Sequence, residues 1–117
     1  FMSEERFYFV KKNISSDAEQ DLKNIQCPIF GVFGSEDLNV DCEESHQTYE
    51  RVFLKNNTAN YQLKIYPEAT HALLKSKHFN TMHPGIGFLF KWELLGKRAF
   101  VKDVLNDFSE FVIQNSK

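Results

Sequence analysis

The sequence predicts an α/β fold in which a few parallel strands are covered by flanking helices. Two short strands are indicated, one by a continuous apolar run at residues 29–33 and one by an alternating pattern at residues 61–66. Helical periodicity lies between them, at residues 41–55, and again at residues 101–112. A strand, a helix and a second strand in this order form a right-handed crossover unit with parallel strands.

The composition is that of a folded domain. The chain has 117 residues, of which 42% are apolar and 12 are Phe, and this content argues against disorder. The net charge of −2 and the scattered basic residues give no nucleic-acid footprint. No apolar run is long enough to span a bilayer and no signal-peptide pattern is present, so we expect no membrane partner. Cys27 and Cys42 are expected to be buried free thiols, which predicts a cytoplasmic protein.

The N-terminal part, residues 1–24, is weakly patterned and is expected to be a leader of a short strand and turns. Phe7 and Phe9, together with Val10, are spaced as in a short strand. Residues 13–21 are polar and turn-rich, and the stretch from Asp17 onward is compatible with a short helical turn.

The two central strands have different patterns. The run at residues 29–33 follows Pro28 and is closed by Gly34, and such a continuous apolar run is typical of a strand buried on both faces. The run at residues 61–66 alternates and is ended by Pro67, which favours a position at the sheet edge.

Two helices are indicated by their caps and periodicity. Asp41 is the expected N-cap of the first, with Glu43 and Glu44 in the first turn, and this helix should end near Lys55. The second, at residues 101–112, has one apolar and one polar face, so we expect it to pack on the sheet.

Residues 72–98 are too apolar for a solvated loop, and we expect a short helix with irregular flanks there. The aromatic side chains of this stretch have two interpretations, an acyl pocket or a core or partner-facing patch, of which the second is preferred. These side chains are Phe88, Phe90 and Trp92.

Each predicted strand ends in a turn that carries one ionisable side chain. The first strand is followed by Gly-Ser-Glu-Asp at residues 34–37, and the second runs into Tyr-Pro-Glu-Ala-Thr-His at residues 66–71. Asp37 and His71 are therefore 34 residues apart, each just after a strand. Because sites in parallel sheets gather at the carboxyl edge, we expect these two side chains to share that edge.

This order and spacing resembles the C-terminal part of α/β-hydrolases of the esterase, dienelactone-hydrolase or prolyl-oligopeptidase type. In that fold the catalytic residues follow the chain as nucleophile, acid and histidine. The resemblance implies that residues 25–117 are the C-terminal portion of an α/β-hydrolase domain, with Asp37 as triad acid and His71 as triad base. A neutral imidazole can take the proton of a hydroxyl nucleophile, and a carboxylate fixes the tautomer of that imidazole.

The sequence departs from the family pattern at three points. It contains no Gly-x-Ser-x-Gly motif and no His-Gly-type oxyanion loop, and Thr70 precedes His71 where many relatives have Gly or Asn. A complete fold of this type needs roughly 200–250 residues. We therefore expect the serine nucleophile on a segment upstream of residue 1, and little or no activity in the isolated chain. The open sheet edge should be covered by that segment or by a second copy of the chain.

Other residues offer alternatives for the acid and the histidine. Asp37 is also compatible with a simple turn residue, and Asp41 is the fallback acid, although its N-cap position explains it. His46 is expected to face solvent from its helix. A metal site at His71 with His78 and His83 is not expected, because their spacings match no standard zinc pattern.

Three residues of the chain are alternative candidates for the nucleophile, and none is favoured. Ser35 precedes a strand-end Asp, and no helix begins directly after it; Ser76 lacks the context of a nucleophile elbow. Cys42 at a helix start is better explained as a buried thiol.

The leading hypothesis is therefore the acid- and histidine-bearing portion of a serine hydrolase acting on ester or amide acyl groups. It implies a small-molecule acyl substrate and no cofactor or metal. The alternative is a non-catalytic module of hydrolase-like topology that binds a partner or dimerises. A flavodoxin-like or phosphate-handling domain is less favoured, because no Gly-rich loop opens a helix.

Overall fold

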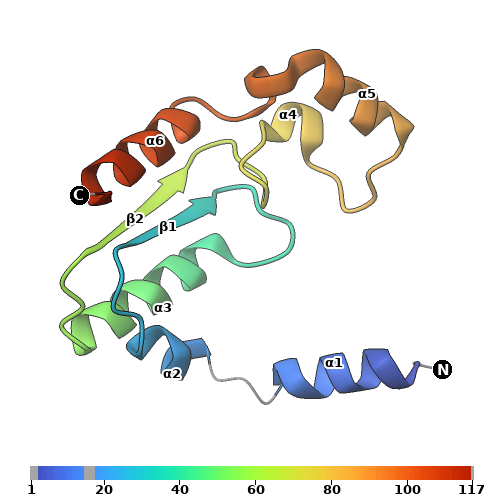
Figure 1. Cartoon of the computed structure of the whole chain (residues 1–117). Helices are drawn as coiled ribbons and strands as arrows, with labels where there is room; N and C mark the ends of the chain where they lie inside the picture. Colours follow the sequence, from blue (N-terminus) through green and yellow to red (C-terminus); the bar gives the residue numbers. More distant parts are fainter. Residues whose placement is uncertain (1–2, 15–17, 117) are drawn as a thin grey trace.

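A computed structural model describes residues 3–14 and 18–116 of the chain. The secondary structure alternates between helices and two strands (Figure 1). The elements are α1 (Glu4–Ile14), α2 (Ala18–Lys23), β1 (Ile29–Gly34), α3 (Cys42–Lys55), β2 (Tyr61–Tyr66), α4 (Ser76–Phe79), α5 (Ile86–Leu95), the 3₁₀ helix η1 (Gly96–Ala99) and α6 (Val104–Asn115).

The two strands form a parallel sheet, as the sequence predicts. Ile29 is opposite Tyr61 and Gly34 is opposite Tyr66, so the strands are in register from end to end. Their carboxyl ends lie at the same edge of the sheet (Figure 1). The turn after β1, which carries Asp37, and the loop after β2, which carries His71, both begin at this edge and are called the two functional turns below. In the part of the chain that the structure describes, β1 pairs with β2 alone.

Helices α3 and α6 cover opposite faces of the sheet. Successive side chains of a strand point to opposite faces. On one face Phe33 contacts the ring of Tyr49 in α3, with centroids 5.5 Å apart. On the other face Phe30 contacts Phe108 and Phe111 in α6, at 5.4 and 5.3 Å. The prediction that the C-terminal helix packs on the sheet is therefore confirmed, while β1 itself is only half-buried within this chain.

Two core clusters lie beyond the carboxyl ends of the strands, around the loop that follows β2, and Val52 and Phe53 of α3 are buried as well. One cluster joins the end of β2 to the following loop and the start of α6, and consists of Tyr66, Ala69, Leu73, Val101 and Val104. A second joins that loop to α4 and η1, and consists of Leu74, Phe79 and Ala99. The loop that carries His71 is thus anchored by buried apolar side chains on both sides of the histidine.

The N-terminal prediction of a short strand is wrong. Phe7 and Phe9 belong to α1, a helix that Glu4 and Glu5 favour because acidic side chains stabilise a helix N-terminus. A two-residue alternation is too short to outweigh this local preference. The expected helical turn is present as α2, and residues 15–17 of the predicted turn region lie outside the described residues.

The cysteines differ in burial from each other. Cys42 is buried at the start of α3, as expected, whereas Cys27 is exposed. The reason is local, since β1 begins only at Ile29 and Cys27 lies outside the sheet. None of the helices within the described ranges combines the length and apolarity that a bilayer crossing needs.

Residues 72–98 contain more regular structure than the sequence indicated. They form two helices and a 3₁₀ turn, with an irregular connection before α5. The aromatic side chains of this stretch differ in their surroundings. Phe88 packs against Phe79 of the second core cluster, with centroids 5.0 Å apart, and is stacked on Trp92, whereas Phe90 is exposed. The C-terminal helix begins at Val104, after Asp103 adopts a left-handed conformation.

Candidate active site

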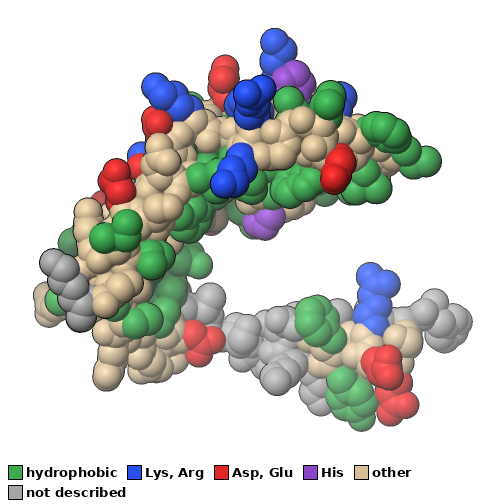
Figure 2. Space-filling model, turned by 45° about the horizontal axis from the view of Figure 1, so that its top comes forward, with side chains coloured by type: hydrophobic (Ala, Val, Ile, Leu, Met, Phe, Trp, Pro, Cys, Tyr) green, Lys and Arg blue, Asp and Glu red, His purple; other side chains and the backbone are tan. Residues whose placement is uncertain are grey.

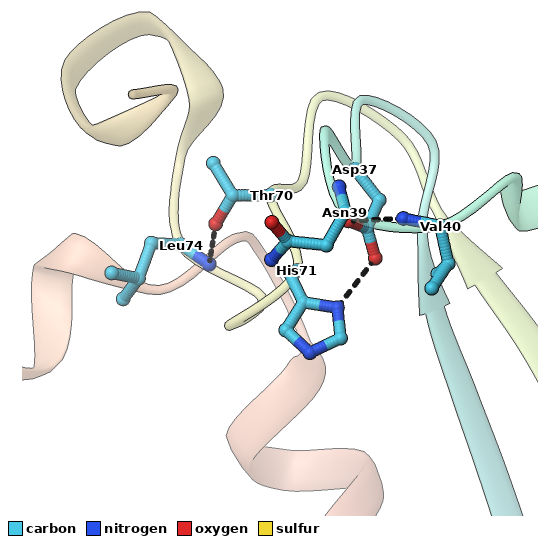
Figure 3. Close-up of polar contacts among 6 residues, drawn as sticks. All are labelled: Asp37, Asn39, Val40, Thr70, His71 and Leu74. Carbon is cyan, nitrogen blue, oxygen red and sulfur yellow. Dashed lines mark hydrogen bonds and ion pairs between the residues drawn. The ribbon is translucent and has the colours of Figure 1, made fainter. Parts of the chain in front are cut away.

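Asp37 and His71 meet at the carboxyl edge of the sheet. Asp37 lies in the tight turn after β1, where its N–H donates to the Gly34 carbonyl, and His71 lies in the loop after β2. The Nδ1 atom of His71 is 2.7 Å from Oδ2 of Asp37 (Figure 3). The structure therefore brings the two predicted residues into direct contact.

The carboxylate of Asp37 is held by the backbone on its other side. Oδ1 accepts the N–H of Asn39 at 2.7 Å and the N–H of Val40 at 3.3 Å, and the side chain is only 5% exposed. Burial raises the pKa of Asp37, but the hydrogen bonds from Asn39, His71 and Val40 outweigh it, so the pKa is lowered from the usual 3.8. Asp37 is therefore ionised at neutral pH and fixed in orientation.

The loop after β2 presents His71 by means of Thr70. The Thr70 N–H donates to the carbonyl of Leu74. Oγ1 of Thr70 accepts the Leu74 N–H at 3.3 Å, as Figure 3 shows. Leu73, in the left-handed region with φ 60°, completes the turn by donating to the Thr70 carbonyl. These bonds close a short loop whose exposed tip is His71. The Thr at position 70 thus has a turn-closing role of its own.

The two functional turns are tied to each other as well as to their strands. The N–H of Ser35 donates to the carbonyl of Tyr66, and Oγ of Ser35 accepts the N–H of Glu68 at 3.0 Å. Gly34 lies under the second turn, and a Cβ atom built on it would be 2.3 Å from the carbonyl oxygen of Thr70. Only a residue without Cβ permits this approach. These supporting roles were not predicted from the sequence, although a Gly at the end of a strand is a signal for such a close approach.

The contact also fixes the chemistry of the imidazole. An ionised carboxylate can only accept hydrogen bonds, so the proton of a neutral His71 is on Nδ1, where it donates to Asp37. The Nε2 atom then carries the lone pair, and it points away from Asp37 (Figure 3). The His71 side chain is 59% exposed, so a reacting group can reach it. The arrangement can accept a proton at Nε2 and stabilise the resulting imidazolium.

The alternative acid and the other histidines have different roles. Asp41 caps α3 by accepting the N–H of Glu44 at 2.9 Å, as the sequence predicts. His46 was expected to face solvent, but it is half-buried because its ring packs on Phe33, with centroids 5.7 Å apart. His78 contacts the ring of Phe79. Among the described residues no group of His, Cys, Asp and Glu side chains is arranged to hold a metal ion.

Of the three other candidate nucleophiles, Ser35 and Cys42 have side chains that the structure explains in another way. Ser35 links the two turns, and Ser76 donates its backbone N–H to the Glu68 carbonyl at the start of α4. Burial, together with nearby carboxylates, raises the pKa of the Cys42 thiol, which disfavours the reactive thiolate.

Comparison with known proteins agrees with this arrangement. The sequence profile of the dienelactone hydrolase family matches residues 6–84, which include both strands, Asp37 and His71. Neither a curated protein nor a solved structure matches the chain. Because the family match spans more than half of the chain, the protein belongs to the dienelactone hydrolase family and is a hydrolase of the α/β-hydrolase type.

Proposed function

We propose that Asp37 and His71 are the acid and the base of a catalytic triad that hydrolyses an ester or amide acyl group. The observation that supports this most strongly is the 2.7 Å contact between His71 Nδ1 and a buried, backbone-held Asp37. A surface histidine and a turn aspartate have no need of this geometry. Acyl transfer by a serine requires an acid in hydrogen-bond contact with a base, and the ends of two adjacent parallel strands hold Asp37 and His71 in such contact.

In this proposal His71 acts at Nε2. It takes the proton from a serine hydroxyl, whose oxygen then attacks the carbonyl carbon of the substrate. The imidazolium is stabilised by Asp37 and returns the proton to the departing alcohol or amine, which leaves an acyl-enzyme. Water then attacks this ester, with His71 again accepting and returning the proton.

The nucleophile is proposed to lie on a segment outside the 117 residues. The chain has no Gly-x-Ser-x-Gly motif, and the hydroxyl of Ser35 already accepts the N–H of Glu68. The edge of β1 opposite β2 is unpaired among the described residues. A further parallel strand on that edge would bring its own carboxyl end, and a serine there, to the same edge as His71.

The experiment is active-site labelling of the protein as its native source produces it. A fluorophosphonate should label one serine, and His71→Ala should abolish the labelling because the hydroxyl is no longer activated. His83→Ala, which changes an exposed histidine before α5, is the matched control and should label normally. Unchanged labelling in His71→Ala would refute the role proposed for this histidine.

A second candidate function is a non-catalytic module that binds a partner or a second copy of itself. The observation that favours it is the outer face of α5, where Ile86, Phe90 and Leu94 are 78%, 75% and 86% exposed. Figure 2 shows hydrophobic side chains gathered over the end of the molecule that contains α5. Labelling of a serine that depends on His71 would exclude a purely non-catalytic role.

A further inference from the structure

A small depression lies directly beside His71. Its volume is about 160 Å³, and its lining comes from the turn after β1, the loop after β2 and the residues between α4 and α5. It therefore joins the two functional turns to a part of the chain, residues 79–88, that the proposed triad does not use.

The floor and walls of this depression are apolar. Leu74 and Phe79 are buried beneath it, and Phe88 forms a wall through its edge-to-face contact with Phe79. Leu38 and Met82 line it with exposed side chains, one from the turn of Asp37 and one from the connection before α5. An apolar group bound here would move out of water and into contact with Leu, Phe and Met side chains. The free energy gained by this transfer grows with the apolar area of the group.

The lining also disfavours a charged ligand group, because the described residues that form it offer no opposite charge. Among the described residues around the depression, none is Asp, Glu, Lys or Arg, and the polar members other than His71 and Thr70 are Asn39, Asn80 and Thr81. A carboxylate or ammonium group would lose its hydration without gaining an opposite charge. The size is also restrictive, because an apolar cavity of about 150 Å³ admits benzene.

We propose that this depression is a substrate subsite for a neutral apolar group of about the size of a phenyl ring, or a short branched alkyl group. The inference rests on the proposed function, since it places the group beside the histidine that exchanges the proton. It narrows the substrate class to esters or amides that carry such a group close to the bond that is cleaved.

The test is a binding measurement on the full chain that does not depend on catalysis. The sequence contains two Met residues, so a sample labelled with [¹³C-methyl]methionine gives two methyl signals, and Met82→Leu identifies the signal of the subsite. Benzyl alcohol should shift the Met82 signal in a saturable way. Benzoate, which has the same ring and a charge, should shift it much less at equal concentration.

Two variants show whether the response comes from the subsite. Leu38→Ser removes an apolar side chain from the lining and should weaken benzyl alcohol binding about three- to tenfold, by the loss of part of one leucine contact. Leu54→Ser changes an exposed leucine of α3 outside the depression and should leave the affinity unchanged. Leu38→Met, which keeps an apolar side chain, should restore binding.

The proposal is overturned if the Met82 signal does not shift saturably, if benzoate binds as well as benzyl alcohol, or if Leu38→Ser has no effect. Failure of the proposed function would look different. In that case the serine labelling would be indifferent to His71→Ala, while the Met82 titration would still report whether the subsite binds.

Discussion

The site depends on single residues whose orientation is fixed by backbone groups. Asp37 receives two backbone N–H groups on Oδ1, which leaves Oδ2 for His71. Its carboxylate therefore cannot rotate without losing hydrogen bonds on both sides. The same hydrogen bonds stabilise the ionised carboxylate and so lower the pKa of Asp37.

Replacement of Asp37 by Asn should destabilise the chain in a pH-dependent way. At pH 7 the loss of a buried charged hydrogen-bond acceptor should lower the free energy of unfolding by roughly 1–3 kcal/mol. Since the folded-state pKa lies below the usual 3.8, the folded state binds fewer protons, and the contribution of Asp37 is present above pH 3.8 and lost as the pH falls through the folded pKa. Urea unfolding at pH 7 and pH 2.5 should show the gap between wild type and variant narrowing at the lower pH.

The neighbouring Glu36→Gln serves as the control for charge removal, because Glu36 is exposed. It should change stability by less than about 0.5 kcal/mol at either pH. An Asp37→Asn variant as stable as the wild type at pH 7 would contradict the structural importance of this carboxylate.

Replacement of Gly34 by Ala should displace the loop of His71. The added Cβ would lie 2.3 Å from the carbonyl oxygen of Thr70 and 2.5 Å from that of Ala69, and backbone atoms cannot move aside cheaply. We expect a loss of roughly 1–3 kcal/mol in the free energy of unfolding. The downfield NMR signal of the His71 Nδ1 proton should weaken or disappear.

Gly87→Ala is the matched control, because a Cβ at Gly87 meets nothing within 4 Å. This residue lies inside α5, so Ala should be neutral or stabilise the chain by up to about 1 kcal/mol. If Gly34→Ala kept the stability and the His71 signal of the wild type, the close approach of the two turns would not be essential.

At this scale the sequence predicted that Asp37 and His71 share one edge of the sheet, and the structure places them in contact, but the groups that hold them were not predicted. Asp37 and His71 could be predicted because each directly follows a strand pattern. The roles of Gly34 and Ser35 depend on two turns approaching each other from about 30 residues apart in the chain, which local patterns do not encode. His46 was misjudged for the same reason, since its burial depends on Phe33.

At the scale of elements, helices and strands with strong local signals were predicted well. In α3, β1 and β2 a hydrophobic pattern coincides with residues that mark the ends of the element, such as Asp41 before α3 and Pro67 after β2. The prediction that β1 is buried on both faces is wrong, because the strand is only half-buried. An apolar run shows that a strand is suited to burial, but it does not show that other parts of the same chain cover it. The helix α1 was missed because its sequence is amphipathic only weakly and its aromatic side chains are exposed.

Replacement of Asp41 by Ala tests the cap of α3 and the choice of acid together. Loss of the hydrogen bond to Glu44 N–H should reduce the free energy of unfolding by about 1 kcal/mol, while Asp41→Asn, which can also cap, should be nearly neutral. The His71 Nδ1 proton signal should persist in both variants, because Asp37 is its partner. Loss of that signal in Asp41→Ala, with α3 intact by circular dichroism, would favour Asp41 as the acid.

At the scale of the whole molecule, the chain exposes more surface than its mass explains. A folded monomer of 13.7 kDa is expected to expose about 6,600 Å², whereas this chain exposes 9234 Å². Its radius of gyration, 16.9 Å, is also above the roughly 13 Å expected for this length. The excess of about 2,600 Å² is comparable with the area that a large protein interface buries.

The isolated chain should therefore self-associate as its concentration rises. The unpaired edge of β1 and the apolar face of α5 both favour contacts that remove them from water. Sedimentation velocity should show larger species growing between about 5 and 200 µM, a range in which weak to moderate interfaces form. The double variant Phe90→Ser/Leu94→Ser should reduce this association, because it removes two exposed apolar side chains from α5.

The control for that variant is Ile113→Ser, which changes an apolar residue on α6 that is also largely exposed and should leave association unchanged. A discrete dimer that the α5 variant dissolves would favour a second copy as the natural partner. Open-ended association that persists in the α5 variant would favour the β1 edge, and with it an upstream segment that carries the serine. A chain that stays monomeric throughout the concentration range would contradict both, since the surface left uncovered would then be compatible with water.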